Sequence, residues 1–275
     1  MQPARITDWD DAYANGAHIP AGDTFPPRWS AAAEAFRADL TGRERARLDI
    51  GYGSGEREVL DLFMPEGAAQ GRMVFVHGGY WRAFDKSRWS HLAAGGLSAG
   101  YAVALPSYDL CPTVKISDIT VQIARAINQV AGMVQGPIYL AGHSAGGHLV
   151  TRMVCASSPL TQGVVGRVER VLSISGVHDL RPLLKTEINR DLRLDFEEAT
   201  RESPALTAPR ENIEVVCAVG ADERPEFIRQ TELLASIWSG CGGLMDCLIE
   251  PGKHHFDIID GMTDPASPLL SRLLR

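Results

Sequence analysis

The sequence predicts an α/β protein with a mostly parallel central sheet and helices on both faces. Short apolar runs alternate with longer amphipathic segments along most of the 275 residues. The run 73–76 is continuously apolar, which is typical of a strand buried on both faces. The segment 117–134 instead carries Ile119 and Ile123 on one face, which predicts a long helix. Alternation of this kind indicates strands joined by crossover helices, and therefore a parallel sheet.

The remaining elements follow the same pattern in chain order. We expect strands at 59–63, 73–76, 101–105, 137–141, 168–175, 213–219 and 245–249, and helices at 29–40, 87–98, 117–134 and 147–154. Pro26 and Pro27 precede the first helix, and Ser30 is a candidate to cap it. Residues 1–50 otherwise lack strand character.

Two segments interrupt the alternation, although we expect residues 1–275 to form a single domain. They are about 1–50 at the N-terminus and about 180–211, which is rich in charge and leucine. Each is long enough to cover the carboxyl ends of the strands, where open α/β sheets bind ligands. We therefore expect a small N-terminal cap and a lid-like insert rather than padding at the sheet edges.

The composition favours a soluble cytoplasmic protein. A formal net charge of -7 argues against a nucleic-acid partner. The first ten residues are polar and acidic, and no apolar run approaches the length of a membrane span. The five cysteines are scattered without a C-x-x-C pair, which is typical of reduced cytosolic thiols. The eight histidines lack zinc-type spacing with cysteine, so we expect no metal site.

A glycine-flanked serine follows the apolar run 137–141. Residues Gly142–Gly146 read Gly-His-Ser-Ala-Gly, and a helix is expected directly after them. A serine on a sharp strand-to-helix turn of this form is typical of a nucleophile elbow. The two glycines would let the strand and helix backbones approach closely, while Ser144 takes a strained conformation. The pattern predicts Ser144 as a nucleophile, with a helix N-terminus behind it that favours negative charge.

A candidate acid and a candidate base follow this serine in chain order. A serine hydroxyl needs a base, and the base needs a carboxylate that orients it. Enzymes with this elbow carry the acid and then the histidine after the serine. The candidate acids after strand 213–219 are Asp222, Glu223 and Glu226, and the candidate bases after the last strand are His254 and His255. These residues alone leave both choices open.

A glycine-rich turn follows the expected strand 73–76. Acyl transfer creates a tetrahedral anion, which needs backbone N–H groups that already point at it. Gly78 and Gly79 in the turn, together with Ala145 after the nucleophile, are expected to form this oxyanion hole. Aromatic side chains beside the turn are expected to wall the substrate pocket. The candidate substrate-binding residues are Tyr80, Trp81, Tyr108 and His143.

Together these motifs resemble the kynurenine formamidase (arylformamidase) branch of the α/β-hydrolases, near the hormone-sensitive-lipase-like esterases. The resemblance is carried by His77–Trp81, Ser107–Pro112, Gly142–His148, Pro225–Phe227 and His255–Ile259. It spans about Tyr13 to Gly261. General esterases of the group usually have a third glycine where Tyr80 stands.

The resemblance implies a function and selects among the candidates. The family's acid lies two residues before Pro-Glu-Phe, which favours Glu223 over Asp222, and its histidine precedes phenylalanine, which favours His255. It implies a cofactor-free serine hydrolase of aryl formamides or short esters, with a place in tryptophan catabolism. The alternatives are a general carboxylesterase and a non-catalytic ligand-binding protein on the same fold. We expect a small-molecule substrate as the partner and leave a homodimer open.

Overall fold

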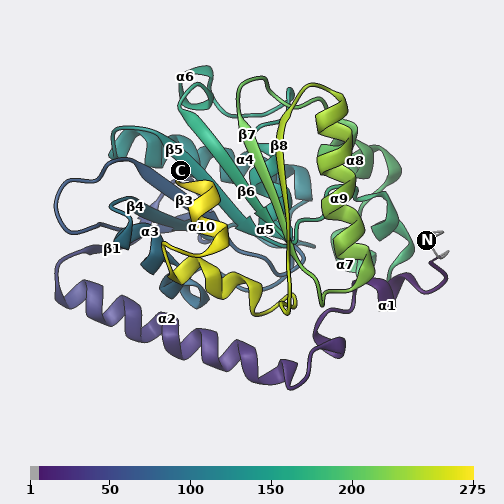
Figure 1. Ribbon diagram of the computed structural model, residues 1–275, viewed down its shortest axis with the longest axis horizontal. Helices are drawn as coiled ribbons and strands as arrows, with labels where there is room; N and C mark the ends of the chain where they lie inside the picture. The colour runs from purple at the N-terminus through teal and green to yellow at the C-terminus, as the bar shows by residue number, and fades with distance from the viewer. Residues whose placement is uncertain (1–5) are drawn as a thin grey trace.

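An eight-stranded sheet forms the centre of the computed structural model, which describes residues 6–275 (Figure 1). The strands are β1 (Ala46–Gly51), β2 (Val59–Phe63), β3 (Arg72–Val76), β4 (Ala102–Pro106), β5 (Ile138–His143), β6 (Val168–Ile174), β7 (Glu214–Gly220) and β8 (Leu244–Glu250). Their order across the sheet is β1-β2-β4-β3-β5-β6-β7-β8. The β1–β2 and β2–β4 pairs are antiparallel, and every pair from β4 to β8 is parallel. The predicted fold class is therefore confirmed.

Helices cover both faces of this sheet. They are α1 (Trp9–Tyr13), α2 (Phe25–Gly42), α3 (Ala94–Ser98), α4 (Ile116–Met133), α5 (Ala145–Arg152), α6 (Gln162–Val165), α7 (Asn189–Leu192), α8 (Phe196–Arg201), α9 (Pro225–Gly240) and α10 (Pro268–Leu273). Apolar side chains of α4, α5 and α9 form one core cluster with the sheet, and those of α2, α3 and α10 form the other. Helix α2 runs along the lower side of the molecule in Figure 1.

Alternation along each central strand divides its side chains between the two clusters. On β3, Val74 and Val76 belong to the cluster with α4 and α5, while Met73 and Phe75 belong to the one with α2. All four are essentially inaccessible to solvent. A strand with two buried faces reads as an unbroken apolar run, because its side chains alternate between the faces. This is why the central strands could be predicted from the sequence.

Three local expectations differ from the structure. Strand β1 was not expected, because as an edge strand it is mostly exposed and carries polar residues that hide the pattern. Helix α2 begins at Phe25, so Ser30 lies inside the helix and donates to the carbonyl of Pro26 at 3.0 Å instead of capping. The segment 87–98 forms short 3₁₀ turns and only then α3, which contains Gly95 and Gly96, both weak helix formers.

The parallel register brings the carboxyl ends of six strands, β4, β3, β5, β6, β7 and β8, to one edge of the sheet. Val76 of β3 pairs with Gly142 of β5, which in turn pairs with Ser173 of β6. Strands β7 and β8 continue the same register. The loops that leave these strands carry most of the candidate catalytic residues, and the topology therefore gathers them at one edge.

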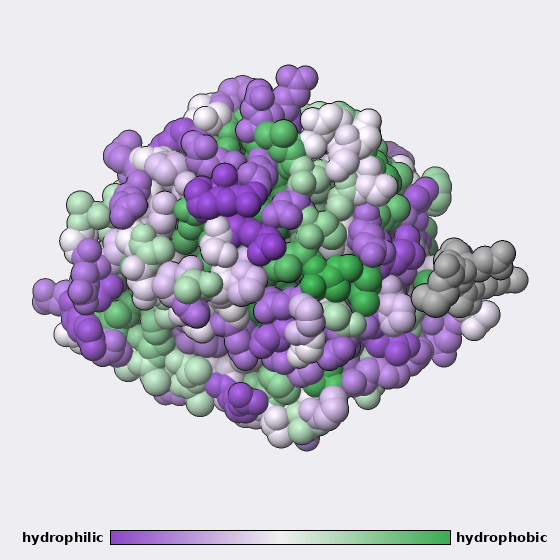
Figure 2. Space-filling model, viewed as in Figure 1, coloured by the Kyte–Doolittle hydropathy of each residue, from purple (hydrophilic) through white to green (hydrophobic). Residues whose placement is uncertain are grey.

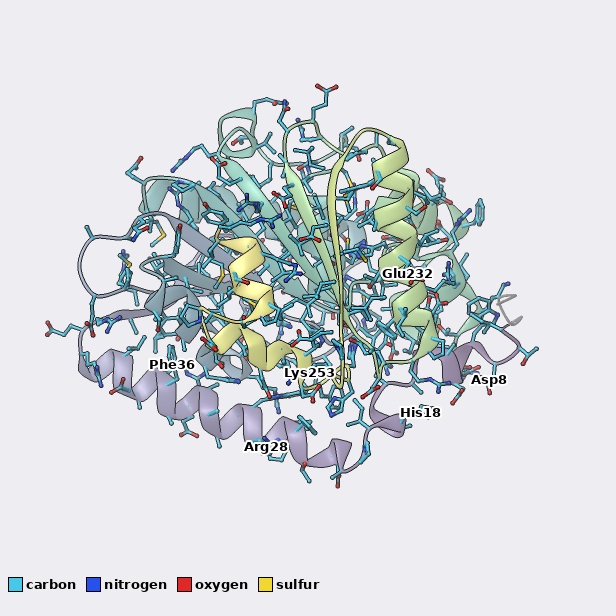
Figure 3. All side chains as sticks on the ribbon, viewed as in Figure 1. Asp8, His18, Arg28, Phe36, Glu232 and Lys253 are labelled. Carbon is cyan, nitrogen blue, oxygen red and sulfur yellow. The ribbon has the colours of Figure 1, made fainter. Side chains whose placement is uncertain are left out.

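The N-terminal segment crosses this edge before α2 begins. The ring of Phe25 lies 5.2 Å from that of His254, so the start of α2 packs against the loop after β8. In Figure 3, Arg28 lies on the part of α2 near this loop, where Lys253 is also labelled. The face in Figure 2 is mostly polar, with small apolar patches between charged residues. Residues 1–5 of the expected cap lie outside the described residues.

Two further properties concern the described part of the chain. None of the helices between residues 6 and 275 combines the length and the hydropathy that crossing a bilayer requires. Over the same residues, no group of three or more His, Cys, Asp or Glu side chains is arranged to hold a metal ion.

Candidate active site

Ser144 occupies a strained turn between β5 and α5. Its φ of 55° and ψ of -117° lie outside the regions that L-residues favour. Its N–H donates to the carbonyl of Ile174 on β6 at 2.8 Å, which fixes the turn against the sheet. A Cβ atom on Gly142 would overlap the carbonyl of Gly146, and one on Gly146 would overlap the carbonyl of Val76. The elbow therefore needs glycine on both sides of the serine.

His255 and Glu223 form a short hydrogen-bonded pair. Nδ1 of His255 lies 2.6 Å from Oε2 of Glu223, and both residues are buried. The other carboxylate oxygen, Oε1, accepts from the hydroxyl of Ser175 at 2.5 Å and from the N–H of Gly220 at 2.9 Å. A carboxylate held by donors on both oxygens is fixed in orientation, so the imidazole it holds has Nδ1 as the donor. Ser175 was not among the expected site residues, because a serine at the end of a strand carries no distinguishing sequence signal.

The other candidate acids and the other candidate base lie elsewhere. Asp222 is exposed to solvent. Glu226 is buried in α9, where it accepts from the hydroxyl of Tyr13 at 2.9 Å. His254 lies 3.2 Å from Asp257, three residues further along the same loop. Of the alternatives left open by the sequence, the structure brings together Glu223 and His255.

The glycine turn after β3 lies against the elbow. A Cβ on Gly78 would stand 3.0 Å from Cβ of Ser144, so only glycine lets the turn come this close. Gly79 has a φ of 114°, which also favours glycine. Within residues 6–275, the N–H groups of Gly78, Gly79 and Ala145 have no hydrogen-bond acceptor on the protein. Free backbone donors beside a serine are what an oxyanion hole requires.

Ser144 and His255 open onto one cavity of about 310 Å³. Its lining also includes the aromatic residues Tyr13, Trp29, Tyr80, Phe84, Trp89 and Phe256. The ring of Trp29 lies 4.8 Å from that of Trp89 and 5.2 Å from that of Phe256. The N-terminal segment thus supplies one wall of the cavity. From the sequence, this segment was expected only to cover the ends of the strands. A volume near the lower end of ligand pockets suits a substrate with a single aromatic ring.

Two of the four candidate substrate-binding residues line this cavity. Tyr80 and His143 contribute to its wall. Trp81 does not: it is fully buried, and its ring packs 5.1 Å from that of His148. Tyr80 and Trp81 both have positive φ, 50° and 55°, and their side chains differ in place: Tyr80 lines the cavity, and Trp81 lies in the hydrophobic core. Tyr108 does not line the cavity either.

Tyr108 instead packs against the glycine turn and hydrogen-bonds to it. Its ring stacks on that of His77 at 4.4 Å, and its hydroxyl donates to the carbonyl of His77 at 2.9 Å. Nδ1 of His77 donates in turn to the carbonyl of Gly78 at 2.7 Å. Burial lowers the pKa of His77 to about 4, so the ring is neutral at neutral pH. The expected contact of Tyr108 with substrate is thus replaced by a supporting role, since its polar atom is used within the protein.

The ring of His143 lies beside the catalytic candidate and is uncharged. Burial, and then the neighbouring His255, hold the pKa of His143 well below its usual value. Its Nε2 donates to the backbone carbonyl of His255 at 2.9 Å, and the two rings lie 4.5 Å apart. His143 therefore ties the histidine loop to the elbow and cannot be a proton acceptor at this atom.

Residues 73–266 match the alpha/beta hydrolase family. The chain is 30% identical over 273 residues to the kynurenine formamidase of Salmo salar, with 91% of this chain and 92% of that protein covered. This chain belongs to the kynurenine formamidase-like branch of the alpha/beta hydrolases. The kynurenine formamidase of Drosophila melanogaster is 29% identical to this hydrolase, over 86% of this chain and 83% of its own.

Solved structures share the fold. A candidate thioesterase from Silicibacter sp. tm1040 is 49% identical to this hydrolase, with a TM-score of 0.93 and with 98% of this chain and 99% of that chain covered. Esterase B from Lactobacillus rhamnosis is 16% identical, with a TM-score of 0.66 and with 90% and 92% covered, and shows the fold alone. The protein is therefore a hydrolase, and a purely ligand-binding role on the same fold is set aside.

Proposed function

We propose that this hydrolase cleaves small aryl formamides, with N-formylkynurenine as the leading substrate, through an acyl-enzyme on Ser144. The observation that carries the proposal is the hydrogen-bonded pair of His255 and Glu223, 2.6 Å apart, in which His255 lines the same aromatic cavity as Ser144. Short esters are the second candidate substrates, because the same residues attack both kinds of carbonyl.

In the first half of the reaction, Ser144 Oγ attacks the formyl carbon while Nε2 of His255 takes the hydroxyl proton. Glu223 keeps the proton of His255 on Nδ1 and stabilises the imidazolium that forms. Negative charge develops on the carbonyl oxygen. The free N–H groups of Gly78, Gly79 and Ala145 are the donors available to it.

The tetrahedral intermediate then collapses. The imidazolium of His255 gives its proton to the aryl nitrogen, the carbon–nitrogen bond breaks, and the aromatic amine leaves. Ser144 is left with a formyl ester. His255 next takes a proton from water, which attacks this ester, and formate leaves as Ser144 recovers its proton. No cofactor enters either half.

The cavity supports a small acyl group and an aromatic leaving group. Tyr80 occupies the position at which related esterases carry a third glycine, so the space beside the oxyanion donors is narrowed. Trp29 and Phe256 offer faces and edges on which an aryl ring can pack. An aryl amine is also a better leaving group than an alkyl amine. The similarity to enzymes named kynurenine formamidase points to the same class of substrate.

The role of the two segments that cover the sheet edge, and the cellular compartment of the enzyme, can also be proposed. Tyr13 and Trp29 of the N-terminal segment line the cavity, and so does Ile188, so we assign a lid role to residues 6–50 and to 180–211. All five cysteines are unpaired, including the exposed Cys241 and Cys247, which fits the reducing cytoplasm. A cytoplasmic formamidase of this kind would serve tryptophan catabolism.

A comparison of kcat/KM across substrates tests the proposal. We expect N-formylkynurenine to exceed p-nitrophenyl acetate, and p-nitrophenyl acetate to exceed longer-chain esters. An acetyl thioester belongs in the same series, since one similar structure is described as a candidate thioesterase. If activity rises with acyl length and no formamide is cleaved, the enzyme is a carboxylesterase or thioesterase instead.

A further inference from the structure

The hydroxyl of Tyr80 joins the glycine turn to the N-terminal segment. Tyr80 directly follows Gly78 and Gly79, and its hydroxyl donates to the backbone carbonyl of Tyr13 at 2.6 Å. Burial, and then the charge of Glu223, raise the pKa of this hydroxyl above its ordinary value, so it keeps its proton and acts as a donor. The turn that carries the proposed oxyanion donors is thereby bonded to a residue 67 positions earlier in the chain.

The glycine turn needs such a bond because its backbone is strained. After Gly79, Tyr80 and Trp81 have φ of 50° and 55°, in the left-handed region that residues other than glycine rarely adopt. A residue in this region keeps its conformation only where the surrounding structure holds it. Trp81 is held by the hydrophobic core. Tyr80 lies in the cavity wall, and within residues 6–275 the bond to Tyr13 is the one hydrogen bond of its side chain.

Tyr13 is itself fixed at the start of α9, which follows the loop of Glu223. Its hydroxyl donates to Oε1 of Glu226 at 2.9 Å and accepts from Nε2 of Gln230 at 3.2 Å. Its ring lies 5.9 Å from that of Phe227, which in turn lies 4.6 Å from the ring of His255. Tyr13 is only 1% exposed. Its carbonyl is therefore an acceptor with a fixed position relative to the acid and the base.

We propose that Tyr80 is a positioning residue, whose hydroxyl, held by the carbonyl of Tyr13, fixes the oxyanion donors of the glycine turn relative to Ser144. Donors of this kind stabilise the anion only if they point at it before it forms. The inference rests on the proposed function for the acyl-transfer mechanism. It adds that the N-terminal segment contributes to the chemical step, and not only to the wall of the cavity.

The test is Tyr80→Phe, which removes the hydroxyl and keeps the ring in the cavity wall. The matched control is Tyr52→Phe, because the hydroxyl of Tyr52 is also buried and donates to a backbone carbonyl, that of Ser107, while Tyr52 does not line the cavity. Two readouts are compared with the wild type. The first is kcat/KM for p-nitrophenyl acetate. The second is the ratio of the inhibition constants of acetophenone and 2,2,2-trifluoroacetophenone.

The two ketones separate the positioning of donors from simple binding. They have nearly the same shape, but only the trifluoromethyl ketone is readily attacked by a serine hydroxyl to form a tetrahedral adduct with a negative oxygen. We expect Tyr80→Phe to lower kcat/KM by about ten- to a hundredfold, and to weaken the trifluoromethyl ketone by a similar factor, because its oxyanion donors are misplaced. The inhibition constant of acetophenone should change by less than about twofold, and Tyr52→Phe should leave both readouts within about threefold.

Two outcomes would overturn the inference. One is a kcat/KM within about twofold of the wild type in folded Tyr80→Phe. The other is an equal weakening of both ketones, since this would mean that the hydroxyl shapes the cavity for binding and does not position the oxyanion donors. If the wild type cleaves no formamide, the formamidase proposal fails, and the ester and the ketones still decide the role of Tyr80.

A second measurement covers the case in which Tyr80→Phe does not fold. A crystal structure of the wild-type enzyme with trifluoroacetophenone bound to Ser144 locates the negative oxygen directly. The inference requires this oxygen within about 3.2 Å of an N–H of Gly78 or Gly79, with the Tyr80 hydroxyl still on the carbonyl of Tyr13. An oxygen bonded by the Tyr80 hydroxyl itself, or one that makes no bond to the glycine turn, would refute it.

Discussion

Replacing Glu223 by glutamine should nearly abolish hydrolysis without unfolding the protein. The Oε1 side of Glu223 faces two donors, the N–H of Gly220 and the hydroxyl of Ser175. A glutamine oxygen would stay on that side, so its NH₂ group would face Nδ1 of His255. That nitrogen must then accept, which puts the ring proton on Nε2. A protonated Nε2 cannot take the proton of Ser144.

The expected loss in kcat/KM follows from this wrong tautomer. It reaches up to about 10⁴-fold in enzymes with this arrangement, or about 5 kcal/mol of transition-state stabilisation. The assay is kcat/KM on p-nitrophenyl acetate and N-formylkynurenine, together with the melting temperature. Asp222→Asn is the matched control, because Asp222 is exposed, and it should change activity by less than about threefold. Activity of Glu223→Gln within tenfold of the wild type, or an equal loss in Asp222→Asn, would refute the assignment.

Three further changes have distinct expected outcomes. Ser144→Ala should lower kcat by at least about 10³-fold and leave the melting temperature unchanged. Wild-type activity in this variant would show that Ser144 is not the nucleophile. Gly146→Ala should destabilise strongly, because its Cβ would overlap a backbone carbonyl of β3, whereas Gly163→Ala, with open space around it, should not; equal melting temperatures would contradict this. Burial lowers the pKa of His148 and of His178 to about 3, so the unfolded chain binds more protons below about pH 6.5. Unfolding free energy should therefore fall on acidification from about pH 6.5 toward pH 3, by up to about 1.4 kcal/mol per pH unit for each histidine, and a flat profile in urea titrations would show that these rings are not buried neutral.

The features predicted well from the sequence are local ones. The elbow around Ser144 needs specific glycines at fixed spacing, and the central strands are apolar on both faces, so a short window contains the signal. The pairing of His255 with Glu223 was not predicted from a local pattern. Chain order alone allowed several acids, and the choice came from the resemblance to a family.

The features that could not be predicted from the sequence depend on contacts between segments that are far apart in the chain. Asn15 and Trp29 lie in a stretch with little strand pattern, and nothing local indicates that they reach the cavity. Trp81 was expected in the pocket wall beside Tyr80. It lies instead in the core against His148, after two consecutive residues with positive φ, and non-glycine residues rarely adopt such angles. Strand β1 was missed because an exposed edge strand carries polar residues on both faces.

The packing of Trp29 against Phe256 also constrains when activity can arise during synthesis. One ring comes from a segment made early and the other from a segment made late, and they meet in the cavity wall at 5.2 Å. A ribosome adds residues from the N-terminus onward, so the elbow and glycine turn exist before the histidine loop does. During synthesis, Trp29 is therefore present before Phe256, the ring that it packs against in the folded protein. Because the proposed base His255 lies in the same late segment, the proposed catalytic residues are all present only once the last part of the polypeptide has been made.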